Sequence, residues 1–323
     1  MKISVIFTGG TIGSTVKNGW ADVDESTRYA LLKNYENNAE IEFDICSPYN
    51  ILSENLSADE LNALQKEIAK TLEKDCDGII VTHGTDTLQY TSAAIEYSFN
   101  GCEKPIVFVS AAYPLENEKT NGFANFEAAV EFIKSRVGKG VFVSYKNDGD
   151  SKVNIHTASR ILQHKEGDSN IYSIEKQPYA TYDGSVVCNG VKYGNSGGMG
   201  VVEYVKNSRI LSVESYPGND YSYSLENVNA VILKPYHSGT LDTANKCFRD
   251  FCNRAREKNI PVFVTNFSAE VSYKSTSVYE ELGIILLQYE TYVSSYMKIW
   301  LGLSLGKDVA SFARKAIANE IAN

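Results

Sequence analysis

Short apolar runs that alternate with helical stretches constrain the fold of this chain more than any other feature. The runs Ile3–Thr8, Gly78–Thr82 and Pro105–Val109 have the length and composition of buried strands. Between the first two runs, the segment 58–74 repeats leucine or isoleucine every three or four residues, which is typical of an amphipathic helix, and Ser57 is placed to cap it. The alternation predicts an α/β fold with a parallel sheet covered by helices on both faces.

The alternation weakens in the middle of the chain and then resumes. From about residue 151 to 206 the sequence is rich in Tyr, Ser and Gly, and we expect short strands, a hairpin and a linker there. Strand and helix patterns return after this stretch, with helices predicted over 241–258 and 308–321. A chain of 323 residues favours two domains.

Charge and cysteine content exclude several classes of protein. The net charge is -9, and the sequence contains no cluster of Lys or Arg that could bind phosphates, so we expect no nucleic-acid partner. The apolar run at the N-terminus is too short for a signal peptide, and no window is long enough to span a membrane, so we expect a soluble cytoplasmic protein. The six cysteines lack a short-spaced pattern and should be free thiols. No CxxC or HExxH motif occurs, so we expect no metal site.

Two threonine-containing motifs follow two of the predicted strands. Thr8-Gly9-Gly10-Thr11-Ile12-Gly13 follows the first strand, and His83-Gly84-Thr85-Asp86-Thr87 follows the strand 78–82. Ligands of such sheets bind beyond the carboxyl ends of the strands, so both motifs should belong to one site. The spacing of the glycines fits neither the dinucleotide-binding nor the phosphate-binding loop.

The residue types in these motifs suit nucleophilic chemistry. A threonine hydroxyl attacks a carbonyl once a base removes its proton, and neighbouring glycines let a substrate approach the backbone closely. Asp86 offers a carboxylate that can hold a substrate ammonium group. Taken singly, the first motif could be only a tight turn, and Thr85 or Asp86 could simply cap a helix. Together the two motifs favour a catalytic site.

The two motifs resemble the signatures of the bacterial-type L-asparaginase and glutaminase-asparaginase family, a TGGTI-type loop and an HGTDT loop. Leu52-Ser53-Glu54-Asn55-Leu56 resembles a third segment of that family, and Val107–Pro114 resembles its strand and loop that normally read like VGAMRP. The resemblance is strong over about residues 1–165 and thinner beyond.

The resemblance implies an N-terminal flavodoxin-like α/β domain and a smaller C-terminal α/β domain. We place these domains over 1–190 and 209–323, with a linker over 191–208. It also implies a homodimer or homotetramer whose sites lie near a subunit interface, with no metal and no organic cofactor.

Roles for individual residues also follow from the resemblance alone. Thr11 would be the nucleophile, and Thr85 would be the second threonine, which activates water or assists proton transfer. Asp86 would bind the α-ammonium group of the substrate with help from Glu54, and Ser53 would bind its α-carboxylate. The remaining substrate contacts would come from Gly10, Gly84, the Ala111 backbone, Trp20 and Gln163.

The chain departs from the family pattern at two positions of the site. Trp20 stands where the family usually has a tyrosine beside the nucleophile, and Trp has no phenolic oxygen to relay a proton. Gln163 stands where the family has its catalytic lysine. A neutral amide is neither a base nor a cation, and loss of an acid–base partner typically lowers the rate by about 10²- to 10⁴-fold. Lys165, two residues later, could replace that lysine, and His164 is a weaker candidate.

Three functions are therefore compatible with the sequence. The first is an asparaginase-like amidohydrolase that converts asparagine, or glutamine, to the acid and ammonia through an acyl-threonine. The second is a family member with impaired catalysis that binds an amino acid as a sensor or regulatory protein. The third is an amidase for another amide, such as an ammonia-supplying subunit of a tRNA-dependent amidotransferase, against which the acidic charge of the chain counts.

Overall fold

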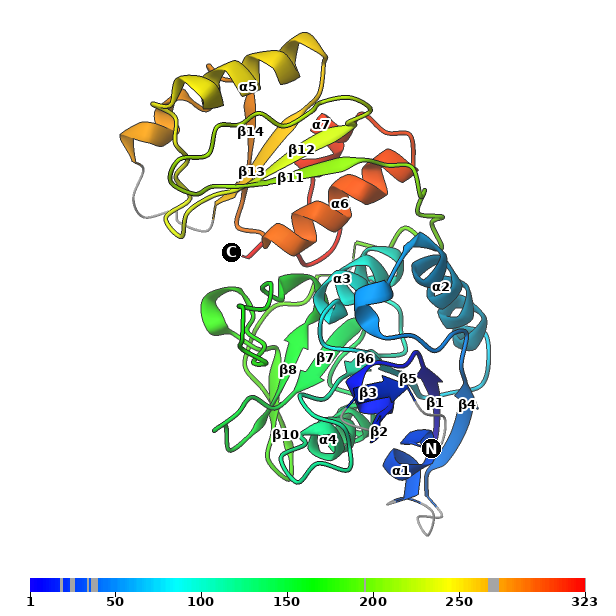
Figure 1. Cartoon of the computed structure of the whole chain (residues 1–323). Helices are drawn as coiled ribbons and strands as arrows, with labels where there is room; N and C mark the ends of the chain where they lie inside the picture. The colour runs from blue at the N-terminus through cyan, green and yellow to red at the C-terminus, as the bar shows by residue number, and fades with distance from the viewer. Residues whose placement is uncertain are drawn as a thin grey trace. The chain divides into compact units, whose positions relative to one another are not determined.

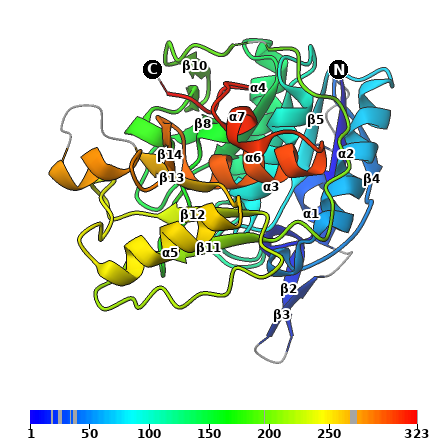
Figure 2. The same cartoon turned by 90° about the horizontal axis from the view of Figure 1, so that it is seen from above.

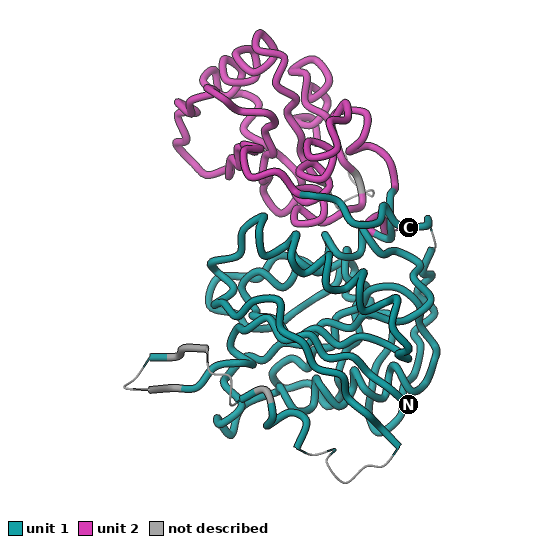
Figure 3. Tube along the Cα trace, turned by 90° about the vertical axis from the view of Figure 1, so that its right-hand side faces the viewer, with its two compact units in different colours: residues 1–203, 317–319 teal, residues 204–316, 320–323 magenta. Residues whose placement is uncertain are grey.

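Two larger β-sheets organise the described residues, and each belongs to its own α/β unit (Figure 3). The computed structural model describes residues 1–17, 20–23, 27–33, 35, 40–194, 196–266 and 273–322. Unit 1 comprises Met1–Glu203 and Ile317–Asn319, and unit 2 comprises Tyr204–Ala316 and the residues from Glu320 onward. The predicted two-domain α/β fold is confirmed.

The sheet of unit 1 is mixed, with the parallel strands at one side and antiparallel strands at the other. Among the described residues its order is β10-β9-β8-β7-β6-β5-β1-β4, and the strands from β4 to β7 are parallel. The central parallel strands are buried on both faces, which explains their continuous apolar sequences. The strands are β1 (Lys2–Phe7), β4 (Glu42–Cys46), β5 (Gly78–Thr82), β6 (Ile106–Val109), β7 (Val141–Tyr145), β8 (Val153–Thr157), β9 (Ala180–Tyr182) and β10 (Val186–Cys188).

Helices cover both faces of this sheet, as the alternation of apolar runs predicted (Figure 1). The helices α2 (Ala58–Leu72) and α3 (Leu88–Phe99) lie on one face, and α1 (Thr27–Lys33) and α4 (Gly122–Ser135) lie on the other. The predicted cap of α2 is present, because the Ser57 hydroxyl accepts from the Asp59 N–H and the Glu60 side chain accepts from the Ser57 N–H. A hairpin of β2 (Ser14–Lys17) and β3 (Trp20–Val23) follows the first threonine motif.

Unit 2 is built on a parallel sheet with the order β11-β12-β13-β14 among its described residues. One apolar cluster packs α5 on one face of the sheet, and a second packs α6 and α7 on the other face (Figure 2). The strands are β11 (Ile210–Glu214), β12 (Ala230–Lys234), β13 (Val262–Asn266) and β14 (Ile284–Gln288), and the helices are α5 (Lys246–Glu257), α6 (Tyr292–Ser304) and α7 (Val309–Ala313).

The predicted helix over 308–321 is wrong beyond Ala313, where α7 ends. The following residues serve other partners: the Asn319 amide, which is buried, donates to Glu96 Oε1 at 2.8 Å and to Asn100 Oδ1 at 3.1 Å within unit 1. The same Glu96 carboxylate accepts from the Ser159 N–H, and its burial raises the pKa of Glu96 to about 7. These tertiary contacts take the place of helix continuation.

The predicted start of the helix over 241–258 is also wrong, by five residues. The helix α5 begins at Lys246 because the Asn245 side chain caps it, accepting from the Cys247 N–H at 2.8 Å. Asn is a preferred capping residue, so this start could have been found in the sequence.

The described residues are also informative about membranes, metals and disulfides. No helix among them is long and apolar enough to cross a membrane. Their His, Cys, Asp and Glu side chains form no group of three that could hold a metal ion. All six cysteines are free, as predicted.

A buried lysine lies between two buried carboxylates in unit 2. Lys298 Nζ lies 2.8 Å from Glu290 Oε2 and 3.0 Å from Glu320 Oε1, and it also donates to the Lys315 carbonyl. The side chains of Lys298 and Glu320 are fully buried, and that of Glu290 is 3% exposed. Burial raises the pKa of Glu290 to about 7, which opposes the lowering effect of the Lys298 charge. The lysine therefore holds the end of the chain against α6.

We expect Lys298→Met to lower the free energy of unfolding by about 3–5 kcal/mol, because two buried carboxylates lose their cation. Urea unfolding at neutral pH measures the effect. Glu290→Gln is the matched control: it leaves the Lys298–Glu320 pair intact and should be destabilising by much less. An equal or larger loss for Glu290→Gln would contradict this account of the triad.

Candidate active site

The strand order of unit 1 places both threonine motifs beyond the same edge of the sheet. The order β4-β1-β5-β6-β7 is that of a flavodoxin-like sheet, in which the direction of winding reverses between β1 and β5. Ligands bind such sheets at this reversal, beyond the carboxyl ends of the strands. The register pairs Phe7 with Thr82, so the motifs that follow leave the sheet side by side.

A backbone contact between two glycines joins the motifs. A Cβ atom on Gly10 would lie 2.2 Å from both Cα and N of Gly84, so only glycine fits there. Gly10 also has a φ of 76°, in the region that favours glycine. In turn, a Cβ atom on Gly84 would lie 2.4 Å from Ser53 Oγ. Three segments that are distant in sequence are therefore in direct contact at this point.

Hydrogen bonds hold the Ser53 segment against both motifs. The Gly10 N–H donates to the Ile51 carbonyl at 2.9 Å, and the Ile51 N–H donates to the Thr8 carbonyl at 3.1 Å. Thr87 Oγ1 donates to the Ser53 carbonyl at 2.9 Å. This last contact was not predicted, although Thr87 belongs to the second motif. Ser53 begins a short 3-10 turn, Ser53–Asn55, and its side chain is buried.

The segment after β6 bonds to the second motif. Ser110 Oγ donates to the His83 carbonyl at 2.6 Å, and Asn125 Nδ2 donates to the Ser110 carbonyl at 2.8 Å. Ala111 is fully buried behind this contact. His83 is buried too, and burial lowers its pKa to about 4, so the ring is neutral near pH 7. Ser110 and Asn125 were not singled out in the sequence, because one serine and one asparagine carry no distinctive signal.

Four predicted site residues have side chains without a partner among the described residues. Thr11 and Thr85 are half-buried, whereas Glu54 and Asp86 are exposed. Within the described part of the chain, none of these side chains makes a hydrogen bond or an ion pair. Their hydroxyl and carboxylate oxygens are free to bind a ligand.

The alternative in which Thr85 or Asp86 caps a helix is wrong. The residue that precedes α3 is Thr87, and its side chain makes no capping hydrogen bond. The first motif does form a turn, because the Gly13 N–H donates to the Gly10 carbonyl at 2.9 Å. A turn and a reactive threonine are compatible, since Thr11 occupies the first position of this 3-10 turn.

The residues at the departures from the family pattern lie outside this contact network. Gln163 and Lys165 are exposed on the loop that follows Ile161, and neither side chain makes a hydrogen bond or an ion pair within the described residues. Lys165 therefore does not bond to Thr85 in this structure. The Trp20 side chain is 79% exposed on β3. The structure thus joins the segments of the two threonines and Ser53, and it leaves the acid–base partner of Thr85 unassigned.

Comparison with known proteins agrees with the motifs and the strand order. The family model described as "Asparaginase, N-terminal" matches residues 2–191. Among solved structures, the thermostable L-asparaginase from Thermococcus kodakarensis superposes with a TM-score of 0.83 at 20% identity and covers 100% of both chains. L-asparaginase I from Vibrio cholerae superposes with a TM-score of 0.78 at 19% identity, covering 100% of this chain and 99% of its own. At these identities the structures establish the fold.

Similar curated proteins carry a different name. A glutamyl-tRNA(Gln) amidotransferase subunit from Thermoplasma volcanium is 30% identical over 188 residues, which cover 57% of this chain and 46% of the relative. The corresponding protein from Methanobrevibacter smithii is 26% identical and covers 99% of this chain and 76% of its own length. The chain thus spans less than half of the length of the relative from Thermoplasma volcanium.

We expect Gly10→Ala to abolish function at this site and to destabilise unit 1 by roughly 1–3 kcal/mol, because its Cβ would overlap the Gly84 backbone. Thermal unfolding and ligand binding measure the two effects. Gly13→Ala is the matched control, since a Cβ there meets nothing within 4 Å. If Gly10→Ala behaved like Gly13→Ala, the two motifs would not be in contact.

Proposed function

Because the chain belongs to the asparaginase family, we propose that it hydrolyses the side-chain amide of a small amino acid amide, asparagine or glutamine, and releases ammonia. The contact between Gly10 and Gly84 carries this proposal. It brings the segments of Thr11 and Thr85 together at the strand ends where ligands of such sheets bind. The unpartnered oxygens of both threonines suit a reaction that uses two hydroxyl groups.

The proposed reaction has two steps. Thr11 Oγ attacks the amide carbon, its proton passes to the departing nitrogen, and ammonia leaves an ester between Thr11 and the substrate. Water assisted by Thr85 then hydrolyses the ester and restores the threonine hydroxyl. Backbone N–H groups of the glycine-rich segments, other than those of Gly10 and Gly13, which already donate to carbonyls, are suited to stabilise the oxyanion in both steps.

Substrate recognition is assigned to the residues around the glycine contact. The exposed carboxylates of Asp86 and Glu54 are suited to bind the α-ammonium group, and the Ser53 hydroxyl is suited to bind the α-carboxylate. The Ala111 backbone would contact the amide group. Gly10 and Gly84 leave room for the substrate beside the backbone, and Trp20 would close over it.

The acid–base partner sets the expected rate. Gln163 cannot supply a proton or a positive charge, so we propose that turnover is slow unless the Lys165 loop rearranges when substrate binds. An amino-acid-binding protein with little turnover is the limiting case of the same site. Whether Thr85 has an acid–base partner therefore separates an efficient hydrolase from a sensor.

A second candidate function is ammonia supply to an amidotransferase. The similarity to proteins named as subunits of glutamyl-tRNA(Gln) amidotransferases favours it. Such a role would use the same threonine chemistry on glutamine, with another protein subunit as partner. The asparaginase proposal instead implies a cytoplasmic homodimer or homotetramer.

Ammonia release from asparagine and from glutamine by the purified protein tests these functions. We expect Thr11→Ala to lower the release to the uncatalysed background, because the nucleophile is gone. Thr11→Ser keeps a hydroxyl and should retain part of the activity. Activity that survives in Thr11→Ala would rule out the proposed nucleophile. Release from glutamine alone would favour the amidotransferase role, and tight binding of asparagine without release would favour a sensor.

Gln163→Lys should raise kcat, by up to about 10²- to 10⁴-fold, because it restores a cationic acid–base group. Steady-state kinetics with the preferred amide measure the change. Gln163→Met controls for the altered side chain, and Lys165→Gln tests the neighbouring lysine. A drop in kcat for Lys165→Gln in the wild-type background, with no gain for Gln163→Lys, would show that Lys165 already serves as the partner.

A further inference from the structure

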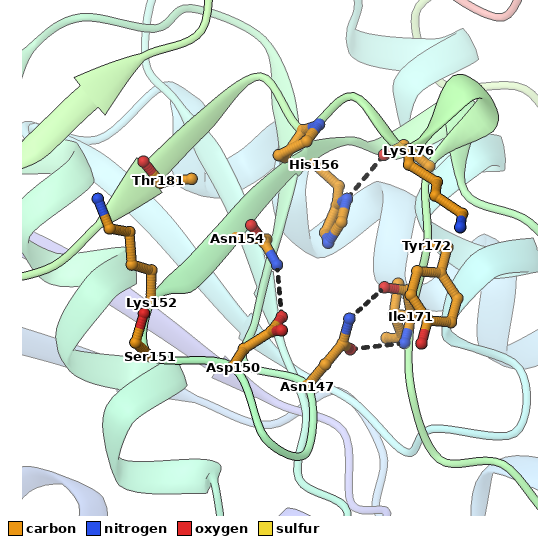
Figure 4. Close-up of a pocket in the computed structure, with 12 residues that line it drawn as sticks. Asn147, Asp150, Ser151, Lys152, Asn154, His156, Ile171, Tyr172, Lys176 and Thr181 are labelled. Carbon is orange, nitrogen blue, oxygen red and sulfur yellow. Dashed lines mark hydrogen bonds between the residues drawn. The ribbon is translucent and has the colours of Figure 1, made fainter.

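A polar pocket in unit 1 has no part in the proposed reaction. Its volume is about 340 Å³, which is at the lower end of the range for small-molecule sites. It lies beside β8, between the loop 147–152 and the segment 171–178 (Figure 4). None of the residues proposed for amide hydrolysis lines it. Its chemistry therefore needs a separate explanation.

An unsatisfied histidine lies in the wall of this pocket. His156, on β8, is 2% exposed, and its Nδ1 lies 2.7 Å from Ser173 Oγ. Its Nε2 is buried and has no hydrogen-bond partner among the described residues. Figure 4 shows the ring in the middle of the lining residues. A buried nitrogen without a partner is unfavourable, and a ligand group in the pocket would remove that penalty.

The hydrogen bond to Ser173 decides what this nitrogen can offer. Burial lowers the pKa of His156 to about 4, so the ring is neutral near pH 7. When the Ser173 hydroxyl donates to Nδ1, the proton of the neutral ring is on Nε2, which then donates to a ligand oxygen. The buried pair can therefore present an N–H donor without burying a positive charge.

Two lysines without partners border the same pocket. Lys152 and Lys176 line it, and neither ammonium group makes a hydrogen bond or an ion pair within the described residues. In Figure 4 they lie on opposite sides of the pocket, with His156 between them. Two cations at one pocket suit a ligand that carries two anionic groups.

The segment that carries Lys176 is held in a strained conformation. Glu175 and Lys176 have φ angles of 59° and 54°, and neither is glycine. Left-handed residues of this kind cost about 1–2 kcal/mol each, and they are concentrated at ligand sites. The Lys176 N–H donates to the Ser173 carbonyl at 2.9 Å, so the strained turn is tied to the serine that orients His156.

Hydrogen-bond acceptors complete the lining. Asp150 Oδ2 accepts from Asn154 Nδ2 at 3.1 Å, which leaves the other carboxylate oxygen of Asp150 for a ligand hydroxyl. Asn147 exchanges two hydrogen bonds with the Ile171 backbone, at 3.0 and 2.8 Å, and so fixes the two loops to each other. The shape of the pocket is thus maintained by contacts within its own wall.

We propose that this pocket is a second ligand site, for a small hydroxydicarboxylate. One carboxylate binds Lys152 and the other binds Lys176, while the central hydroxyl donates to Asp150. His156 Nε2–H donates to the carboxylate on the Lys176 side. The site stands apart from the proposed amide hydrolysis and does not depend on it.

Isothermal titration calorimetry of the full chain tests this site at constant ionic strength. Malate should bind saturably, more tightly than succinate, which lacks the hydroxyl, and propionate should not bind measurably. Saturable binding of inorganic phosphate without binding of malate would overturn the proposal, as would the absence of saturable heat with either dicarboxylate. Because binding is measured directly, the result is independent of ammonia release.

Variants assign the binding to this pocket. Lys152→Gln and Lys176→Asn should each lower the affinity for malate about tenfold, since a hydrogen bond to a charged group is lost. Asn is chosen at position 176 because it tolerates the left-handed backbone there. His156→Asn keeps a polar atom near the position of Nδ1 that can bond to Ser173, but it removes Nε2. It should therefore lower the affinity for malate as well. Lys192→Gln removes a charge outside the pocket and should change nothing. Unchanged affinity in Lys152→Gln and Lys176→Asn would overturn the proposal.

Discussion

The contact between the Gly10 and Gly84 backbones is the constraint on which the rest of the site depends. Two loops can approach this closely only where neither has a Cβ atom, and the rigid strands β1 and β5 behind them set their positions. Ser53 packs against the same point. The geometry of the site is therefore fixed by the register of a buried sheet, and the loops themselves need little internal stability.

Sequence reasoning found the elements whose signal is local. The buried strands β1 and β5 are continuous apolar runs, and the Ser57 capping box is a pattern of four residues. It missed β4, an edge strand, although Glu42-Phe43-Asp44-Ile45-Cys46 alternates polar and apolar residues and could have been recognised. It also extended the last helix too far, because the partners of Asn319 lie more than a hundred residues away in the sequence and leave no local trace.

The same division applies to the candidate site. The meeting of the two threonine motifs followed from their position after neighbouring parallel strands, which is a rule of topology. The hydrogen bond from Thr87 to the Ser53 carbonyl did not follow, since it depends on the path of a loop. The surroundings of Gln163 and Lys165 could not be predicted from the sequence either. The pairing of Ile161 with Ser173 fixes where that loop starts, and no sequence pattern indicates such an isolated bridge.

The position of Asn319 has a consequence for biosynthesis. A ribosome adds residues in order, and domains generally begin to fold as they emerge. The buried carboxylate of Glu96 then waits for its amide partner until the chain has been extended through the whole of unit 2 to residue 319. Unit 1 can collapse early around its apolar core, but its polar interior closes last. The nascent chain therefore carries an incompletely satisfied N-terminal unit while residues 204–319 are synthesised.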